Sequence, residues 1–192
     1  MRFEKELDFK PVTAELWNDL EKLFGEHGAY SGCWCMWWRI KRSEFTTQQG
    51  EGNKKALKNI IDSGRIPGIL AYFNNEPIAW CSVAPREQFP VLDRSPTLKR
   101  VDNEPVWSIV CFFIAKQYRK KGLTHALIRA SLEYAKQNGA RIVEAYPLDK
   151  EHSKHTAIEA YTGFATTFQK EGFKEVIRRS RIRPVMRYYF KD

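Results

Sequence analysis

A short basic turn that contains a glycine joins an apolar stretch to a helical pattern. The apolar stretch covers residues 106–115, and Arg119, Lys120 and Lys121 directly precede Gly122. A helix N-terminus carries partial positive charge and unpaired backbone N–H groups, both of which attract phosphate. Gly122 also lets a ligand approach the backbone closely. The turn therefore predicts a site for a phosphate-bearing ligand, although neither the Walker A spacing nor the Rossmann glycine spacing occurs here.

This turn resembles motif A of the GNAT acyltransferases, which reads Arg/Gln-x-x-Gly-x-Gly/Ala between a strand and a helix. The chain reads Arg119-Lys120-Lys121-Gly122-Leu123-Thr124, with Thr124 where the family usually has a second small residue. A later segment, residues 168–173, resembles motif B, commonly Tyr-x-Lys-x-Gly-Phe. The two motifs occur in the family's order, so the resemblance covers residues 106–176.

The resemblance implies an α/β (α+β) GNAT fold. Its central sheet is mixed but mostly antiparallel, with about seven strands, about four flanking helices and a splay between the fourth and fifth strands. We expect residues 1–192 to form a single domain that uses acetyl-CoA and no metal. By resemblance, the cofactor lies along the backbone and the basic turn at Phe112, Phe113, Ile114, Arg119, Lys120, Lys121, Gly122, Leu123 and Thr124.

Two catalytic residues are expected, an acid and a base. The family's usual acid is a tyrosine where this chain has Phe168. A phenol of pKa ~10 can donate a proton to a thiolate, whereas a phenyl ring cannot. Tyr161, earlier in the same region, is the substitute that we expect. Glu104, just before the apolar stretch, is the expected base, with His152 and His155 as alternatives and plain surface residues as the competing interpretation.

Residues 33–39 are unusually rich in tryptophan. In the family, the region between the first two helices often walls the acceptor pocket. The resemblance therefore implies that Trp34, Trp37 and Trp38 shape the acceptor site and that Arg39 binds a carboxylate there. The competing interpretation is that the rings cover the core beneath a pair of helices.

The cysteines do not predict a metal site. Cys81 and Cys111 fall inside expected strands and are interpreted as small buried hydrophobic residues. The Cys33-x-Cys35 pair lacks the second pair, or the histidine spacing, that zinc sites use. No cysteine is placed as a covalent relay, so we expect direct attack in a ternary complex.

Two clusters of basic residues contribute much of the net charge of +9. The first, at the basic turn, is explained by coenzyme A, which is a polyanion. We expect the second cluster to form a solvated face, with a nucleic-acid site as the less favoured interpretation. Its members are Arg178, Arg179, Arg181, Arg183 and Arg187.

Hydrophobic periodicity and turn signals predict the order of the elements. The expected strands are residues 8–12, 66–73, 78–84, 106–115, 141–146, 173–179 and 184–190. The expected helices are a segment from Thr13 to Phe24, residues 53–63 with Asn53 as N-cap, residues 124–138 and residues 162–171. We expect the proline-rich stretch 85–105 to be a surface loop.

These observations predict an N-acetyltransferase that transfers the acetyl group of acetyl-CoA to a primary amine of a small molecule or peptide. The first alternative is a catalytically inactive acyl-CoA-binding or sensor protein of the same fold. The second is a basic nucleic-acid-binding module. The sequence has no run of ~20 apolar residues and no signal peptide at its start, so we expect a cytoplasmic protein with no membrane partner. The family resemblance also allows a homodimer.

Overall fold

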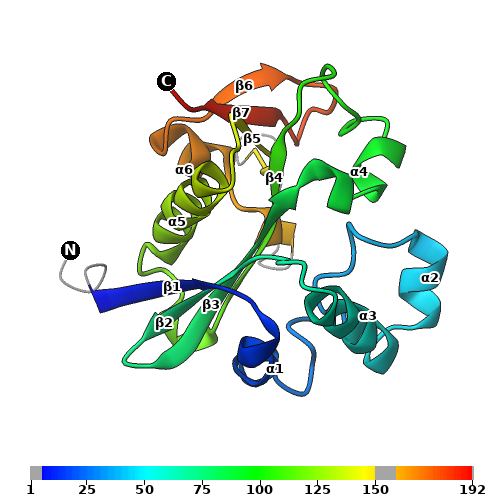
Figure 1. Ribbon diagram of the computed structural model, residues 1–192. Coiled ribbons are helices and arrows are strands. Elements are labelled where there is room, and N and C mark those ends of the chain that lie inside the picture. The colour runs from blue at the N-terminus through cyan, green and yellow to red at the C-terminus, as the bar shows by residue number, and fades with distance from the viewer. Residues whose placement is uncertain (1–5, 150–158, 192) are drawn as a thin grey trace.

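The computed structural model describes residues 6–149 and 159–191 of the chain. Within them, one seven-stranded sheet has the order β1-β2-β3-β4-β5-β7-β6 (Figure 1). Only the β4–β5 pair is parallel among the strand pairs of these residues, which confirms the expected mixed and mostly antiparallel sheet. His152 and His155 lie outside the described residues.

The expected strands all form, with ends that shift by at most three residues. They are β1 (Leu7–Pro11), β2 (Ile69–Phe73), β3 (Glu76–Pro85), β4 (Trp107–Ile114), β5 (Ile142–Ala145), β6 (Lys174–Ile177) and β7 (Val185–Tyr189). The turn between β2 and β3 places Asn74 and Asn75 in the left-handed region, at φ 49° and 63°. Asparagine tolerates that conformation better than most residues, which explains why the chain reverses there.

The helices cover both faces of the sheet. They are α1 (Trp17–Phe24), α2 (Arg42–Thr47), α3 (Glu51–Asp62), α4 (Val91–Arg94), α5 (Leu123–Gln137) and α6 (Ala165–Lys170). Short 3-10 helices are η2 (Ala14–Leu16), η3 (Arg86–Gln88), η4 (Lys116–Tyr118) and η6 (Glu159–Thr162). Helices α2 and α4 were not predicted, since both are too short for a clear periodic pattern.

Two apolar layers hold the helices on the sheet. Helices α5 and α6 lie on one face (Figure 1). There Leu127 of α5 and Phe168 of α6 are fully buried in a cluster with β3 and β4 residues. On the other face, Leu20 of α1 and Leu57 of α3 pack on Trp80 of β3. Alternate residues of a strand point to opposite faces, so each central strand contributes to both layers.

The sheet opens between β4 and β5. Only the first three residues of β4 pair with β5, the last of these being Ile109 opposite Ala145. The pairing of β4 with β3 continues to Ile114, but its register shifts so that Val110 is an extra residue on β4. An extra residue of this kind bends a strand and increases its twist. The bulge therefore lies where β4 turns away from β5, and the expected splay is confirmed.

The segment 85–105 is not simply a surface loop. It contains η3 and α4, and Phe89, Leu92 and Leu98 from it form a third apolar cluster with Val110. The Arg86 side chain is almost completely buried and pairs with Glu144 of β5 at 3.1 Å. The prediction of a surface loop rested on the many prolines and charged residues of this segment. It failed because one of those charges, Arg86, is buried by pairing with Glu144, which is distant in the sequence.

The solvated face predicted for the C-terminal arginines is wrong for two of them. Arg187 is 3% exposed and bonds Glu144 at 2.8 Å and Asp102 at 2.6 Å. Arg183 donates to the Tyr146 carbonyl at 2.6 Å and to the Thr162 hydroxyl at 2.7 Å. Both arginines therefore serve the fold, and the basic face that a nucleic-acid site would need is smaller than the sequence indicates.

Asn53 is not the N-cap of α3. That helix begins two residues earlier, and its N-cap is Gly50, with φ 85°. The Asn53 side chain is fully buried instead and donates to the Gly32 carbonyl at 3.1 Å. This bond ties α3 to the loop between α1 and α2, which carries the tryptophan-rich segment.

Candidate active site

The second half of β4 has one edge without a strand partner in the described residues. The Ala115 N–H bonds the Ile78 carbonyl on the β3 side. Because backbone groups alternate between the two edges of a strand, those of Phe112 and Ile114 point the other way, toward the space that β5 leaves. Their N–H groups can therefore pair with an extended ligand that lies along β4.

The guanidinium of Arg119 is held at the end of this edge. Its Nε atom donates to the Ile114 carbonyl at 2.9 Å, while the side chain stays exposed. This bond fixes the cation at the point where β4 leads into the basic turn. Arg119 is therefore placed to meet a negative group on a ligand that follows the strand.

The basic turn has the backbone geometry of an anion-binding loop. Lys120 and Gly122 have left-handed φ angles of 61° and 82°, and Gly122 is the N-cap of α5. A non-glycine residue in this conformation costs about 1–3 kcal/mol and occurs preferentially at ligand sites. In the described part of the chain, the N–H groups of Lys120, Gly122, Leu123 and Thr124 have no hydrogen-bond acceptor. The turn thus fits a pyrophosphate, which would accept from these groups.

A cavity of about 340 Å³ lies beside the open edge of β4. Cys111, Phe112 and Phe113 of β4 all line it. Consecutive strand residues point to opposite faces of a sheet, so a cavity that touches all three must lie at the edge of the strand. The cavity and the unpaired N–H groups therefore face the same space.

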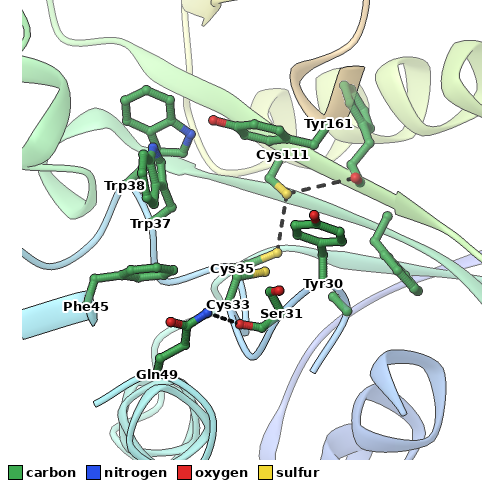
Figure 2. Close-up of a pocket in the computed structure, with 13 residues that line it drawn as sticks. Tyr30, Ser31, Cys33, Cys35, Trp37, Trp38, Phe45, Gln49, Cys111 and Tyr161 are labelled. Atoms are coloured by element: carbon green, nitrogen blue, oxygen red, sulfur yellow. Dashed lines mark hydrogen bonds between the residues drawn. The ribbon is translucent and has the colours of Figure 1, made fainter. Parts of the chain in front are cut away.

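The rest of the wall comes from the loop between α1 and α2, from α2 and the turn that follows it, and from η6. Figure 2 shows Trp37, Trp38 and Phe45 on one side of the cavity, with the Tyr161 ring and the Cys35 and Cys111 sulfurs across from them. The full set is Ala29, Tyr30, Ser31, Cys33, Cys35, Trp37, Trp38, Phe45, Gln49, Cys111, Phe112, Phe113 and Tyr161.

The loop that supplies much of this wall is held in a strained conformation. Ala29, Ser31, Trp34 and Cys35 have positive φ angles between 44° and 69°. Such angles persist only where packing enforces them. Here the Trp34 ring stacks on Trp17, with centroids 5.9 Å apart, which anchors the loop on α1.

Two of the predicted acceptor residues line the cavity and two do not. Trp37 and Trp38 are on its wall. Trp34 is 4% exposed and lies in the core, as the competing interpretation predicted. Arg39 is also buried: its guanidinium donates to the Pro67 carbonyl at 2.8 Å and lies over the Phe89 ring at 4.4 Å. In these contacts the Arg39 guanidinium stabilises the fold, and it is not placed to bind a carboxylate in the cavity.

Glu104 is not near this cavity. It precedes the paired end of β4, and it lines a separate hollow with Lys136 and Arg141. Nearly the whole length of β4 separates it from Phe113, and at about 3.3 Å per strand residue that separation is at most roughly 30 Å. The prediction considered distance along the sequence and did not consider which end of β4 the ligand would occupy.

Tyr161, in contrast, is part of the wall. Burial raises its pKa to about 12, so the phenol keeps its proton across the neutral range. The neighbouring Thr162 accepts the Arg183 hydrogen bond, which ties η6 to the end of β5. Tyr161 is therefore a positioned hydrogen-bond donor at the cavity.

Phe168 stands in the core rather than in the cavity. It is fully buried, and its ring centroid lies 6.0 Å from that of Phe112. A phenyl ring supplies no proton, so the family's usual acid has no direct counterpart at this position.

Sequence reasoning missed Tyr30, Phe45 and Gln49. Phe45 belongs to α2, which was not predicted, and Gln49 lies in the turn after that helix. Tyr30 precedes the tryptophan-rich segment. No sequence pattern marks these residues. The 53% exposure of Tyr30, for example, is known only from the three-dimensional structure.

Neither metal chemistry nor a membrane span is indicated in the part of the chain that the structure describes. No group of three or more histidine, cysteine, aspartate or glutamate side chains there is arranged to hold a metal ion. In the same residues, no helix has the length and apolar character needed to cross a bilayer.

Solved structures share this fold at low identity. The N-acetyltransferase PaiA of Thermoplasma acidophilum, in complex with coenzyme A, aligns over 96% of this chain and 99% of its own, with TM-score 0.55 and 14% identity. A GNAT-family acetyltransferase from Streptococcus agalactiae aligns over 97% and 96%, with TM-score 0.57 and 12% identity. An uncharacterised Bacillus halodurans protein aligns over 95% and 83%, with TM-score 0.55 and 19% identity. At these identities the likeness shows the fold alone.

The two sequence comparisons differ. A search of curated proteins gives no match. The family model described as the acetyltransferase (GNAT) family matches residues 34–164, which is well over half of the chain and includes β4, the basic turn and Tyr161. The chain therefore belongs to the GNAT acetyltransferase family.

Proposed function

We propose that this protein is an N-acetyltransferase that moves the acetyl group of acetyl-CoA onto the primary amine of a small molecule or peptide. The observation that carries the proposal is the continuity of three features. The open edge of β4 joins a basic anion-binding turn at one end to a cavity beside Phe113. That is the arrangement which a thioester on a long phosphorylated arm requires. Use of acetyl-CoA also favours a cytoplasmic location.

The turn residues would hold the phosphates. The N–H groups of Gly122, Leu123 and Thr124 would donate to pyrophosphate oxygens, and Arg119 would add charge. Thr124 retains its backbone N–H, and its hydroxyl can donate as well. Its branched side chain narrows the approach that glycine or alanine leaves open in relatives.

The β4 backbone would position and polarise the thioester. The N–H groups of Phe112 and Ile114 point into the open edge, where the amide groups of the pantetheine arm can pair with them. An N–H aimed at the thioester carbonyl stabilises the negative charge that forms on its oxygen during attack. The side chains at these positions matter less than the backbone.

Tyr161 would assist the departing thiolate. Its pKa of about 12 lies well above the ~8.5 of a thiol, so full proton transfer to the sulfur is unfavourable. A hydrogen bond from the phenol to the sulfur stabilises the leaving group without that transfer.

We propose direct attack by the amine, without a cysteine relay, because Cys33 and Cys35 have raised pKa values, caused by hydrogen bonds within the cysteine group and by burial. Such thiols are poor nucleophiles.

A binding protein without catalytic activity is the alternative, and Phe168 is the observation that favours it. The two functions are separated by measuring product. The protein is incubated with acetyl-CoA and a panel of amines, and acetylated amine is detected by mass spectrometry together with released CoA. We expect turnover with at least one amine, and its loss in Gly122→Trp. Tight acetyl-CoA binding with no product across the panel would contradict the enzymatic proposal.

A further inference from the structure

We propose that the acceptor is an arylamine, an aromatic amine that is neutral at pH 7. The inference rests on the proposed function, because it assigns the cavity beside β4 to the acceptor of acetyl transfer. It concerns the chemical class of the acceptor, which the family leaves open.

The cavity wall is apolar and carries no formal charge among the residues that the structure describes. Aromatic rings and cysteine thiols make most of it, and Tyr30, Ser31 and Gln49 supply polar atoms. These three residues are exposed and form the rim, and Tyr161, which is less exposed, adds a hydroxyl. The interior therefore offers no carboxylate to an ammonium group.

Three cations lie close to residues of the cavity wall or directly behind it. The Arg42 guanidinium lies over the Trp37 ring, 3.9 Å from its centroid. Arg183 is close enough to Tyr161 to lower its pKa in part, against the larger effect of burial. Arg39 packs behind the wall against Phe89. A positively charged acceptor would be repelled by these cations, and no carboxylate among the lining residues would offset its desolvation.

Alkylamines and arylamines differ in their protonation state at pH 7, and this difference favours an arylamine as the acceptor. At pH 7 an alkylamine of pKa ~10.4 has only about 1 molecule in 2,500 in the neutral, nucleophilic form. An arylamine delocalises its nitrogen lone pair into the ring and is neutral at the same pH. It needs no general base to become nucleophilic, and the structure brings no such base to the cavity in its described residues.

The rings of the wall also suit a flat aromatic ligand. Trp37 lies edge-to-face with Phe45 at 5.1 Å and with Trp38 at 6.5 Å. Such arrangements accept a further ring by stacking or by edge contact. Sulfur atoms make favourable contacts with ring edges, and Cys35 and Cys111 provide them opposite the tryptophans (Figure 2).

The transfer step balances without a further reactant. The amine lone pair attacks the thioester carbonyl carbon, so a C–N bond forms and the C–S bond breaks. The sulfur leaves with the electron pair of that bond. The nitrogen loses one proton to solvent, and the thiolate, stabilised by the Tyr161 hydrogen bond, takes up one proton from solvent, so the products are an N-acetyl arylamine and free CoA.

The test compares two amines of nearly the same size and shape, aniline and cyclohexylamine. Acetyl-CoA binding is measured first by calorimetry, and then acetylated product is measured for each amine at pH 7. We expect kcat/KM for aniline to exceed that for cyclohexylamine by at least about tenfold, which is 1.4 kcal/mol.

A matched pair of variants tests the charge argument. Gln49→Glu places a carboxylate at the rim with almost no change in shape. Thr46→Glu adds the same charge one turn earlier on α2, at an exposed residue that does not line the cavity. We expect Gln49→Glu to shift the preference toward cyclohexylamine by about fivefold or more, and Thr46→Glu to leave it unchanged.

The outcomes separate this inference from the proposed function. If acetyl-CoA binds and cyclohexylamine or a peptide amine reacts as well as aniline, the arylamine assignment is overturned and the acetyltransferase stands. If octanoyl-CoA binds more than tenfold tighter than acetyl-CoA and neither amine reacts, the cavity holds an acyl chain, and the assignment is also overturned. If acetyl-CoA does not bind to folded protein, the proposed function itself fails.

Discussion

The Sγ atoms of Cys35 and Cys111 lie 3.3 Å apart. This contact joins the strained loop between α1 and α2 to the part of β4 that β5 leaves unpaired. The Trp80 indole N–H also donates to the Cys35 sulfur, at 3.1 Å. The acceptor wall and the proposed thioester site are thus joined by a partly buried contact between sulfur atoms.

The cysteine thiols are expected to react slowly in the folded protein. Hydrogen bonding to neighbouring sulfur, together with burial, raises the pKa of Cys33 and Cys35, and burial raises that of Cys81 to about 12. A raised pKa leaves little thiolate at pH 8, and the thiolate is the nucleophile. We expect iodoacetamide to label these cysteines at least about tenfold more slowly in native protein than in urea-unfolded protein. Equal rates in the two states, read by peptide mass spectrometry, would show that the thiols are available as nucleophiles.

Tyr161→Phe should lower kcat by about 10- to 100-fold and leave acetyl-CoA affinity almost unchanged. The variant keeps the ring and removes the hydrogen bond to the leaving sulfur. Since the Tyr161 pKa is about 12, the phenol is protonated at every pH below that value, and wild-type kcat should not fall through its ionisation between pH 6 and 9. Steady-state kinetics across that range would check both statements. A variant with normal kcat reduces Tyr161 to a packing residue.

Trp37→Ala should raise the KM for the acceptor by about tenfold, the equivalent of 1.4 kcal/mol. The ring lies on the cavity wall, away from the basic turn, so the KM for acetyl-CoA should stay the same. Tyr189→Ala, which removes an exposed ring elsewhere, is the matched control. An unchanged acceptor KM in folded Trp37→Ala would remove this ring from the acceptor site.

Glu144→Gln should lower the free energy of unfolding by about 3 kcal/mol, because one partner of a buried ion pair is lost. Glu144 is 1% exposed and lies between Arg86 and Arg187, at 3.1 Å and 2.8 Å. Glu175→Gln is the control: it breaks a partly exposed pair with Arg178 and should cost less than about 1 kcal/mol. Urea unfolding measures both. Similar losses in the two variants would mean that the buried network adds little to stability.

The sequence predicted the parts of the fold that local patterns determine. The apolar run of β4 and the glycine-containing turn before α5 were expected, because strand hydrophobicity and glycine turns are local signals. The bulge at Val110 was not expected. It depends on the pairing of β4 with two strands, β3 along most of its length and β5 only as far as Ile109.

The candidate site was predicted less completely, for the same reason. Tyr161, Trp37 and Trp38 were named and line the cavity, whereas Arg39 has its guanidinium in the core and Glu104 lies at the far end of β4. A residue type indicates what chemistry is available. Tertiary packing decides at which end of a strand the residue lies, as for Glu104. It also decides whether a buried carbonyl group binds a charged side chain, as for Arg39.

The most direct test of the central claim is a calorimetric titration of the protein with acetyl-CoA, beside Gly122→Trp. Gly122 has φ 82° at the N-cap of α5, so tryptophan both strains the turn and blocks its N–H groups. The account predicts micromolar binding to the wild type, weakened at least about 100-fold in the variant, with circular dichroism showing that both are folded. Absent binding to the wild type at low salt, or equal binding to the two proteins, would contradict the assignment of the basic turn as the acetyl-CoA site.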